Sequence, residues 1–381
     1  MVAYIVLLLS TALASAISRK NVMRHLVFWP PTIFIVGLKF EVGFDWHVYS
    51  ERFYDFKAMG LADFVNNFWY IFAVSAQEPV FLIISFVSAK LFISYEIFQC
   101  AFYIFFVWSV FRLGNSIGKT NVVAAFCIIH LFVLFTLEMS TLRQMISLSI
   151  FHIALSLILK GRTGKSLKFS LLAPFVQASS LMYIIPAYWV GATKRKAKIW
   201  IFIAGLAVVV VNAIGFSQVL SAMGGVFPNI LASKIEYYAN IRTNGFSLSE
   251  RAFFLVFYII AIALGWKNRR NSSPQIRYVA TLVVYLSILA LVGFSIQTFR
   301  NRLLYEIVIL VSLMLFTKGV RFRSVARMAL IPMGLVFFAM SLSQTSSLVY
   351  VPYQNYIWYQ FMGKESDGYQ RQQILRDLIN R

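Results

Sequence analysis

The chain is poor in charged residues, and in acidic ones above all. Asp and Glu number 14 among 381 residues, against 35 Lys and Arg, and the four types together make up 13% of the chain. A soluble domain carries about 25% charged residues, so an ordinary soluble protein is excluded. Cysteine is scarce too: Cys100 and Cys127 fall inside apolar segments and form neither a CxxC pair nor a disulfide framework.

Motifs for nucleotide cofactors and for metals are missing as well. The chain has no GxGxxG, Walker loop, GxSxG or HExxH pattern, and its four histidines are scattered. Asp45 and His47 form a D-x-H pair, but no third metal ligand follows nearby. We therefore expect no cofactor, no bound metal, and no ATP-driven or NAD-dependent activity.

Long uncharged runs make up much of the chain, because 60% of its residues are hydrophobic. Examples are residues 199–215, 252–266, 278–299 and 328–348. At 1.5 Å per residue each run is about long enough to cross a hydrocarbon core of roughly 30 Å. The runs are continuous, whereas a barrel needs short alternating strands. They predict an all-α, polytopic integral membrane protein with about 11–13 transmembrane or re-entrant helices.

The net charge of +21 comes largely from six short segments. They hold 21 of the 35 Lys and Arg and no acid, which is the pattern of cytoplasmic loops in a polytopic membrane protein. We therefore expect no nucleic-acid partner. Residues 41–77 carry five acids and two bases, so they are predicted to lie on the periplasmic side. The six basic segments are 18–25, 112–119, 160–168, 194–198, 267–277 and 318–327.

This sorting predicts a single membrane domain, residues 1–362, followed by a polar tail, 363–381. Residues 167–191 lie between two basic segments of the same side, so they are expected to form a hairpin of two half-helices. The chain must also cross the membrane an odd number of times between Asp45 and Arg112. Either residues 61–76 also form a span, or one of the three apolar segments 61–76, 79–94 and 97–111 is re-entrant. The two main periplasmic loops are predicted at 41–77 and 216–250.

Ionisable residues at membrane depth are costly and by default indicate function. Arg143, Arg300 and Arg302 begin helices on the periplasmic side, where the sorting of positive charge does not explain them. A guanidinium presents a fixed fork of donors that suits phosphate oxygens and stays protonated. These arginines are therefore candidates to bind a pyrophosphate. The competing interpretation gives them ion pairs with Asp45, Glu138 or Glu306.

Two histidines, His130 and His152, also fall within predicted spans. We interpret both as packed, hydrogen-bonded neutral imidazoles rather than as catalytic groups. Glu78 is a further carboxylate near the predicted periplasmic face, and with Asp45 it is a candidate general base.

Short motifs follow one another along most of the chain. They are Val42-Gly43-Phe44-Asp45 with Tyr49, Glu78-Pro79-Val80-Phe81, Leu142-Arg143-Gln144, Leu172-Ala173-Pro174-Phe175-Val176-Gln177-Ala178-Ser179-Ser180, Arg302-Leu303-Leu304-Tyr305 and Pro352-Tyr353. This series resembles the EpsG-like branch of the Wzy oligosaccharide polymerases. One position departs from that pattern: Gln177 stands where the family usually has a histidine. A glutamine cannot act as a general base near neutral pH.

The resemblance implies a membrane glycosyltransferase of the polysaccharide-polymerase type. Such an enzyme transfers a growing glycan from undecaprenyl pyrophosphate to the next lipid-linked repeat unit at the periplasmic face. The expected partners are those glycan lipids and membrane lipid, with a chain-length regulator and a flippase as further candidates. The resemblance implies catalytic roles for Asp45, Glu78 and Arg143, and substrate binding by Tyr49, Gln144, Gln177, Arg300, Arg302 and Tyr305.

Two other functions remain open. An O-antigen ligase, or another polyprenyl-lipid-dependent glycosyltransferase, would share an arginine-rich site on the same side. A transporter or flippase would handle the same lipid, but it typically shows an internal repeat and a line of ionisable groups through the membrane. The sequence shows neither, which favours the polymerase.

Overall fold

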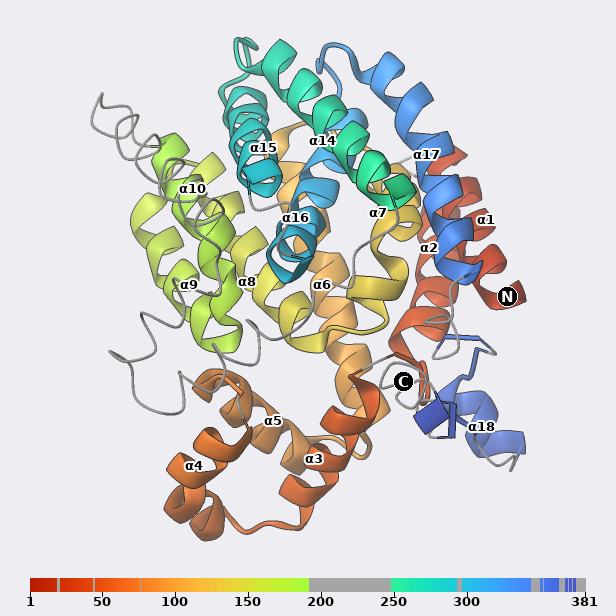
Figure 1. Ribbon diagram of the computed structural model, residues 1–381, viewed down its shortest axis with the longest axis vertical. Coiled ribbons are helices and arrows are strands. Elements are labelled where there is room, and N and C mark those ends of the chain that lie inside the picture. Colours follow the sequence, from red (N-terminus) through yellow and green to blue (C-terminus); the bar gives the residue numbers. More distant parts are fainter. Residues whose placement is uncertain are drawn as a thin grey trace.

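The computed structural model describes residues 1–18, 21–43, 45–75, 77–191, 248–292, 297–343, 350–351 and 353–362, together with 367, 368, 370, 371, 373 and 374. In this part all regular secondary structure is helical, and the only pairing between extended residues is two isolated bridges, Lys39–Asn355 and Thr120–Thr317. Figure 1 shows the helices packed into one bundle, with α16 near its middle. The predicted all-α fold is therefore confirmed.

The bundle begins with α1 (Val2–Ala16), α2 (Val22–Thr32) with its π-helical extension η1 (Ile33–Gly37), α3 (Trp46–Ala58), α4 (Leu61–Ser75), α5 (Pro79–Leu91), α6 (Tyr95–Ile117), and α7 (Val122–Val133) with its π-helical extension η2 (Leu134–Glu138). It continues with α8 (Leu142–Leu159), α9 (Thr163–Val176), the short 3-10 helix η3 (Ala178–Ser180), α10 (Leu181–Gly191), α14 (Leu248–Asn268), α15 (Pro274–Val292), α16 (Gln297–Leu315), α17 (Arg323–Ser343) and α18 (Tyr356–Met362).

Five of the described helices are long and apolar enough to cross a membrane: α6, α8, α14, α15 and α17. Five shorter apolar helical stretches accompany them: Val2–Ala16, Val22–Gly37, Pro79–Leu91, Val122–Glu138 and Ala178–Val190. These lengths agree with a polytopic membrane protein. The predicted span at 199–215 and most of the predicted loop at 216–250 lie outside the described residues, so the predicted total of spans stays a prediction.

The core of the bundle is formed by α7, α8 and α16, whose apolar residues are nearly all buried. The peripheral helices α1 and α17 instead expose large apolar side chains, such as Leu9 at 64% and Met328 at 78%. An exposed apolar surface on continuous helices is what a hydrocarbon environment allows. The central helices therefore hold the polar groups, and the outer helices provide the surface that would face lipid.

Basic segments meet at one end of the bundle through backbone hydrogen bonds. Lys318 N donates to Lys119 O at 3.1 Å, and the side chain of Asn268 donates to Arg321 O at 2.9 Å. Arg24 also contacts this end, through the side chain of Asn121. Four of the six basic segments therefore lie together, as the charge sorting predicts. We call this the basic end.

Helices α3, α4 and α5 form a separate layer at the opposite end of the bundle (Figure 1). Lys90, in the last turn of α5, donates to the carbonyl oxygens of Lys57 and Met59 where α3 ends. α6 then runs from this layer to the basic end, where Thr120 beyond it pairs with Thr317. α4 and α5 stay in the layer, and between Asp45 and Arg112 only α6, among the described helices, is long and apolar enough to cross a membrane. The number of crossings in this region stays a prediction.

Candidate functional site

A polar site lies where the α3–α5 layer meets the bundle. It is assembled from the first residues of α3, α5, α8 and α16 and from the junction between α9 and α10. These segments are far apart in the sequence, so the site exists only in the folded chain. Helix starts are suitable positions for polar side chains, because the first backbone N–H groups there have no partner within the helix and the site around them is already polar.

Arg143, in the first turn of α8, is held by two elements of the layer. Its Nε donates to the hydroxyl of Tyr49 at 2.8 Å, and its Nη1 donates to Oε2 of Glu78 at 2.8 Å. The ion pair is mostly shielded, with exposed side-chain fractions of 23% for Arg143 and 13% for Glu78. Charge-assisted bonds of this length are among the stronger ones in proteins. Two of the three guanidinium nitrogens are thus engaged, and the fork is fixed in direction.

Asp45 immediately precedes α3, and its carboxylate makes no capping bond to that helix. It accepts a long hydrogen bond, 3.4 Å, from the hydroxyl of Tyr49. Burial raises the pKa of Asp45, and the positive charges of Arg143 and Arg302 act against this rise. Burial likewise raises the pKa of Tyr49, which therefore stays a protonated donor. Asp45 is thus a better proton acceptor than an ordinary exposed aspartate.

Glu78 joins the layer to the junction of α9 and α10. Its Oε1 accepts from the backbone N–H of Ala178 at 3.3 Å, while its Oε2 accepts from Arg143. The two helices meet at Gln177, an extended residue with φ −156° and ψ 107°. This non-helical backbone faces other protein groups, which is the condition for it at membrane depth. Gln177 itself is buried, and it directly precedes Ala178, whose backbone N–H binds Glu78.

Arg302, in the second turn of α16, is bound only by neutral acceptors within the described part of the chain. Its Nη1 donates to Oε1 of Gln144 at 2.6 Å and to Oγ of Ser179 at 3.2 Å. Ser179 also donates to the same amide oxygen, at 3.1 Å. A cation without a carboxylate partner keeps its full charge for another anion. The site therefore contains one neutralised arginine, Arg143, and one arginine able to bind an anion.

A sequence model of the EpsG family matches residues 25–361. The chain belongs to the EpsG family. Membership indicates a polysaccharide-polymerase type of role for this membrane protein, and it confirms the resemblance drawn from the motifs. No curated protein and no solved structure matches the chain. The roles of individual residues in this EpsG-family chain are therefore argued from geometry.

Of the two further predicted substrate-binding residues on α16, Arg300 lies apart from the cluster and Tyr305 lies near it. Arg300 is buried, and its guanidinium lies over the ring of Phe254 on α14, 5.0 Å from the centroid. It therefore faces α14, away from the cluster around Arg302. Tyr305 follows Arg302 by three residues on α16, which places it near the same face of the helix, and it is buried at 6% exposure.

For Arg143, the competing ion-pair interpretation did not name the partner that the structure shows. Arg143 does form an ion pair, but with Glu78. Glu138 pairs with Nδ1 of His130 at 2.8 Å, and Glu306 pairs with Nε2 of His152 at 3.1 Å. All four of these side chains are fully buried. Each acid is therefore bound to a histidine in the folded bundle. A buried carboxylate without a partner would destabilise the folded state much more.

His152 connects three helices of the core, and its loss is expected to destabilise the protein. Its Nδ1 bonds Oγ of Ser109 on α6 at 3.1 Å, and its Nε2 bonds Glu306 on α16. We expect His152→Leu to lower the free energy of unfolding by about 3–5 kcal/mol, because Glu306 is left buried without its partner. The double variant His152→Leu/Glu306→Leu should recover most of this loss. Thermal unfolding in detergent would measure both, and equal loss in the two variants would contradict the pairing.

Sequence reasoning missed two contributors. Ser179 lies within a motif already singled out, yet its contact with Arg302 depends on the turn at Gln177, which no spacing rule predicts. Lys39 was overlooked although it carries the same signal as the arginines: a positive charge on the side where sorting does not explain one. Among the described residues, no group of three or more His, Cys, Asp or Glu could hold a metal ion.

Proposed function

We propose that this protein is a polymerase of lipid-linked oligosaccharide repeat units, acting at the periplasmic face of the bacterial inner membrane. It would transfer the growing glycan from undecaprenyl pyrophosphate to the incoming repeat unit. The observation that carries this proposal is Arg302, a cation with neutral partners, in the same site as Asp45, a carboxylate with a raised pKa. The site thus combines an anion-binding group with a proton acceptor.

The reaction needs these two groups. A hydroxyl of the acceptor sugar attacks the anomeric carbon of the donor, the new glycosidic bond forms, and the bond to the pyrophosphate oxygen breaks. The hydroxyl proton would pass to Asp45, since a base with a raised pKa is better matched to neutral pH. Negative charge grows on the leaving pyrophosphate, and Arg302 would stabilise it there.

Arg143 would add a second contact to the pyrophosphate. Its Nε and Nη1 are fixed by Tyr49 and Glu78, so its Nη2 is the nitrogen left for a phosphate oxygen. Because the guanidinium is already oriented, little conformational freedom is lost when the substrate binds. Glu78 would then serve to hold Arg143 and the α9–α10 junction rather than to accept the proton.

The remaining assignments concern the sugars and the lipid. Sugar hydroxyls or phosphate oxygens would be oriented by Tyr49, Gln144, Gln177 and Tyr305. Arg300, which lies against α14, would contribute positive electrostatic potential to the site. The undecaprenyl chain would lie against the apolar faces of the bundle, among membrane lipids. A flippase would deliver the repeat units, and a chain-length regulator would set the polymer length.

A polysaccharide gel from a deletion strain tests the proposal. Complementation with the wild-type protein should restore a ladder of chain lengths, whereas Arg143→Ala should leave a single-repeat band at normal protein level. Arg251→Gln, at an exposed position at the start of α14, is the matched control and should restore the ladder. A full ladder with Arg143→Ala would contradict the site. Loss of all attached glycan on deletion would indicate a ligase. An unchanged ladder on deletion would contradict the polymerase and would favour a transporter or an unrelated glycan-lipid enzyme.

A further inference from the structure

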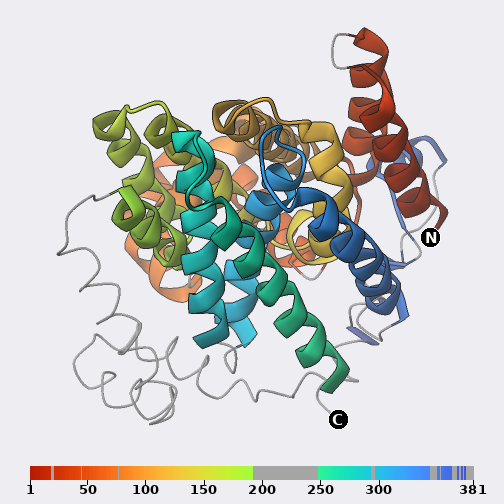
Figure 2. The same ribbon diagram turned by 90° about the horizontal axis from the view of Figure 1, so that it is seen from above.

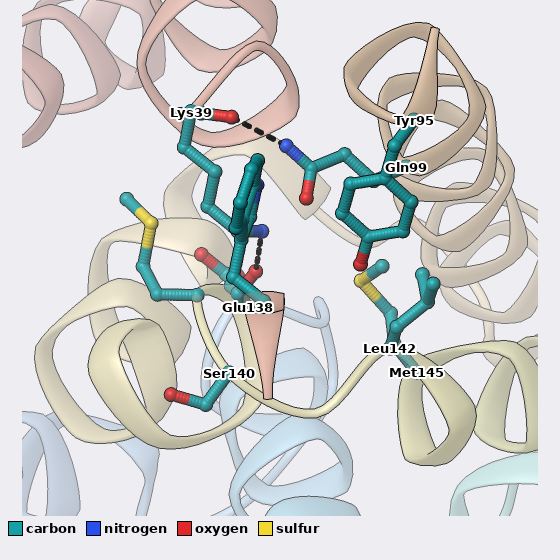
Figure 3. Close-up of a pocket in the computed structure, with 9 residues that line it drawn as sticks. Lys39, Tyr95, Gln99, Glu138, Ser140, Leu142 and Met145 are labelled. Carbon is teal, nitrogen blue, oxygen red and sulfur yellow. Dashed lines mark hydrogen bonds between the residues drawn. The ribbon is translucent and has the colours of Figure 1, made fainter. Parts of the chain in front are cut away.

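A buried lysine lies directly behind the site. Lys39 follows the end of η1 and is only 6% exposed. Its ammonium donates to the backbone oxygen of Glu138 at 2.9 Å, and its own carbonyl accepts from the amide of Gln99 at 2.5 Å (Figure 3). Lys39 therefore links three segments that are remote in sequence: the end of η1, the second turn of α6 and the end of η2.

The position of the ammonium is fixed. The cavity beside it is lined by Trp46, Tyr95 and Met145 among others, and its volume is about 10 Å³. That is roughly the room needed by one water molecule, which leaves the ammonium little space beside the Glu138 carbonyl. Figure 3 shows the lysine reaching down between the helices to the Glu138 backbone.

The acceptor is held as firmly as the donor. Glu138 is the last residue of the π-helical turn η2, and its carboxylate binds His130 one helical segment earlier. π-helical turns are rare and occur frequently at functional sites. Because His130 and Glu138 are both fully buried, the carbonyl that Lys39 contacts belongs to a turn with little freedom.

Two chain segments leave this contact and lead to the two sides of the site. Lys39 is followed six residues later by Asp45, and Glu138 is followed five residues later by Arg143. The segments touch on the way: a Cβ on Gly43 would lie 2.1 Å from the carbonyl oxygen of Met139. Gly43 also has φ +104°, so only glycine permits both this conformation and this approach.

The lysine is costly in this position. Burial lowers its pKa to about 8, although the charge of Glu138 acts against that fall. A methionine of similar length would fill the same space without burying a charge. A buried charge gives weak support to stability as such, and its best-attested use is to fix one arrangement of the chain.

We propose that Lys39 is a positioning residue: its bond to Glu138 sets the spacing between Asp45 and Arg143. The catalytic consequence rests on the proposed function, while the spacing itself does not. A displacement of about 1 Å in a reacting group can reduce a rate by roughly a hundredfold. Other described contacts between the Asp45 segment and the start of α8 include the bond from Arg143 to the Tyr49 hydroxyl and the close approach of Gly43 to Met139.

The kinetic test compares Lys39→Met, Lys39→Arg and Lys90→Met in membrane vesicles supplied with the lipid-linked repeat unit. Lys39→Met should lower kcat about tenfold to a hundredfold and change KM by less than about twofold. Lys39→Arg keeps the donor and the charge and should restore part of kcat. Lys90→Met is the matched control, since Lys90 also donates to backbone carbonyls but at the far end of α3. Wild-type kcat in Lys39→Met, or a rise in KM alone, would overturn the proposal.

A second measurement is independent of activity. Spin labels at Val48 on α3 and Leu181 on α10, both exposed, report the distance across the site in a chain carrying Cys100→Ala and Cys127→Ala. Lys39→Met should broaden or shift this distance distribution, and Lys90→Met should leave it unchanged. An unchanged distribution in Lys39→Met would overturn the positioning role. If the wild-type protein forms no polymer, the proposed function fails, yet the label distances still decide the role of Lys39.

Discussion

Replacing Arg302 by glutamine should lower the rate of polymer formation by about 10²–10³-fold, the typical cost of removing one group that stabilises developing negative charge. Gln144 and Ser179 bind Arg302 through neutral oxygens, so the substitution leaves no carboxylate unpaired and should cost little stability. The effect is expected in kcat more than in KM, because the charge on the pyrophosphate grows as the bond breaks.

The measurement is the initial rate of glycan growth in vesicles, with unfolding temperature recorded for each variant. Arg302→Lys should recover part of the activity, since it keeps the charge and loses the planar fork. Arg251→Gln controls for the loss of any arginine near this end of the bundle. A rate within twofold of wild type for Arg302→Gln, at equal protein level, would remove Arg302 from the catalytic assignment.

The membrane fold could be predicted from the sequence because two strong physical signals act along the whole chain. Continuous apolar runs predict helices, and the sorting of Lys and Arg predicts which segments share a side. The second signal also singled out Arg143 and Arg302, which lie at the site. The sorting of Lys and Arg did not show which residues bind one another, because it assigns a segment to one side of the membrane and does not say which segments are in contact.

The pairing depends on packing details that a sequence pattern does not contain. Glu78 reaches Arg143 because α5 starts beside α8, and Ser179 reaches Arg302 because the chain turns at Gln177. His130 and His152 were expected to be neutral packed groups with unspecified partners, and the structure supplies Glu138 and Glu306. Contacts such as Glu78–Arg143 and Ser179–Arg302, 65 and 123 positions apart, can be placed only once the helices are arranged.

The arrangement also separates the functions of residues that looked equivalent in the sequence. Arg143 and Arg302 are both arginines near helix starts, yet one is neutralised by Glu78 and the other is not. Asp45 and Glu78 are both acids near the same face. Within the described part of the chain Glu78 accepts from two donors, and Asp45 accepts a single long bond from Tyr49. We assign Arg302 and Asp45 to the reacting atoms, because each has weaker or only neutral partners in the described part of the chain.

Asp45→Asn provides the most direct test of the base, and its expected effect is a 10²–10⁴-fold loss of rate, the range for removal of a general base. Asparagine has nearly the same shape and can still accept from Tyr49, so the fold should be retained. It cannot take up the proton of the acceptor hydroxyl. If Glu78→Gln caused the larger loss and Asp45→Asn little, the base would be Glu78.

The pH dependence distinguishes a base from a structural carboxylate. A base works when deprotonated, so the rate should fall as the pH drops through the pKa of Asp45. Burial raises that pKa above the ordinary value of about 3.9, and the acidic limb should lie correspondingly higher. Arg302 lowers the pKa of Asp45, so Arg302→Gln should move the limb of its residual activity to still higher pH, whereas Arg302→Lys should not. A limb at the same pH in wild type and Arg302→Gln would mean that the titrating group is not Asp45.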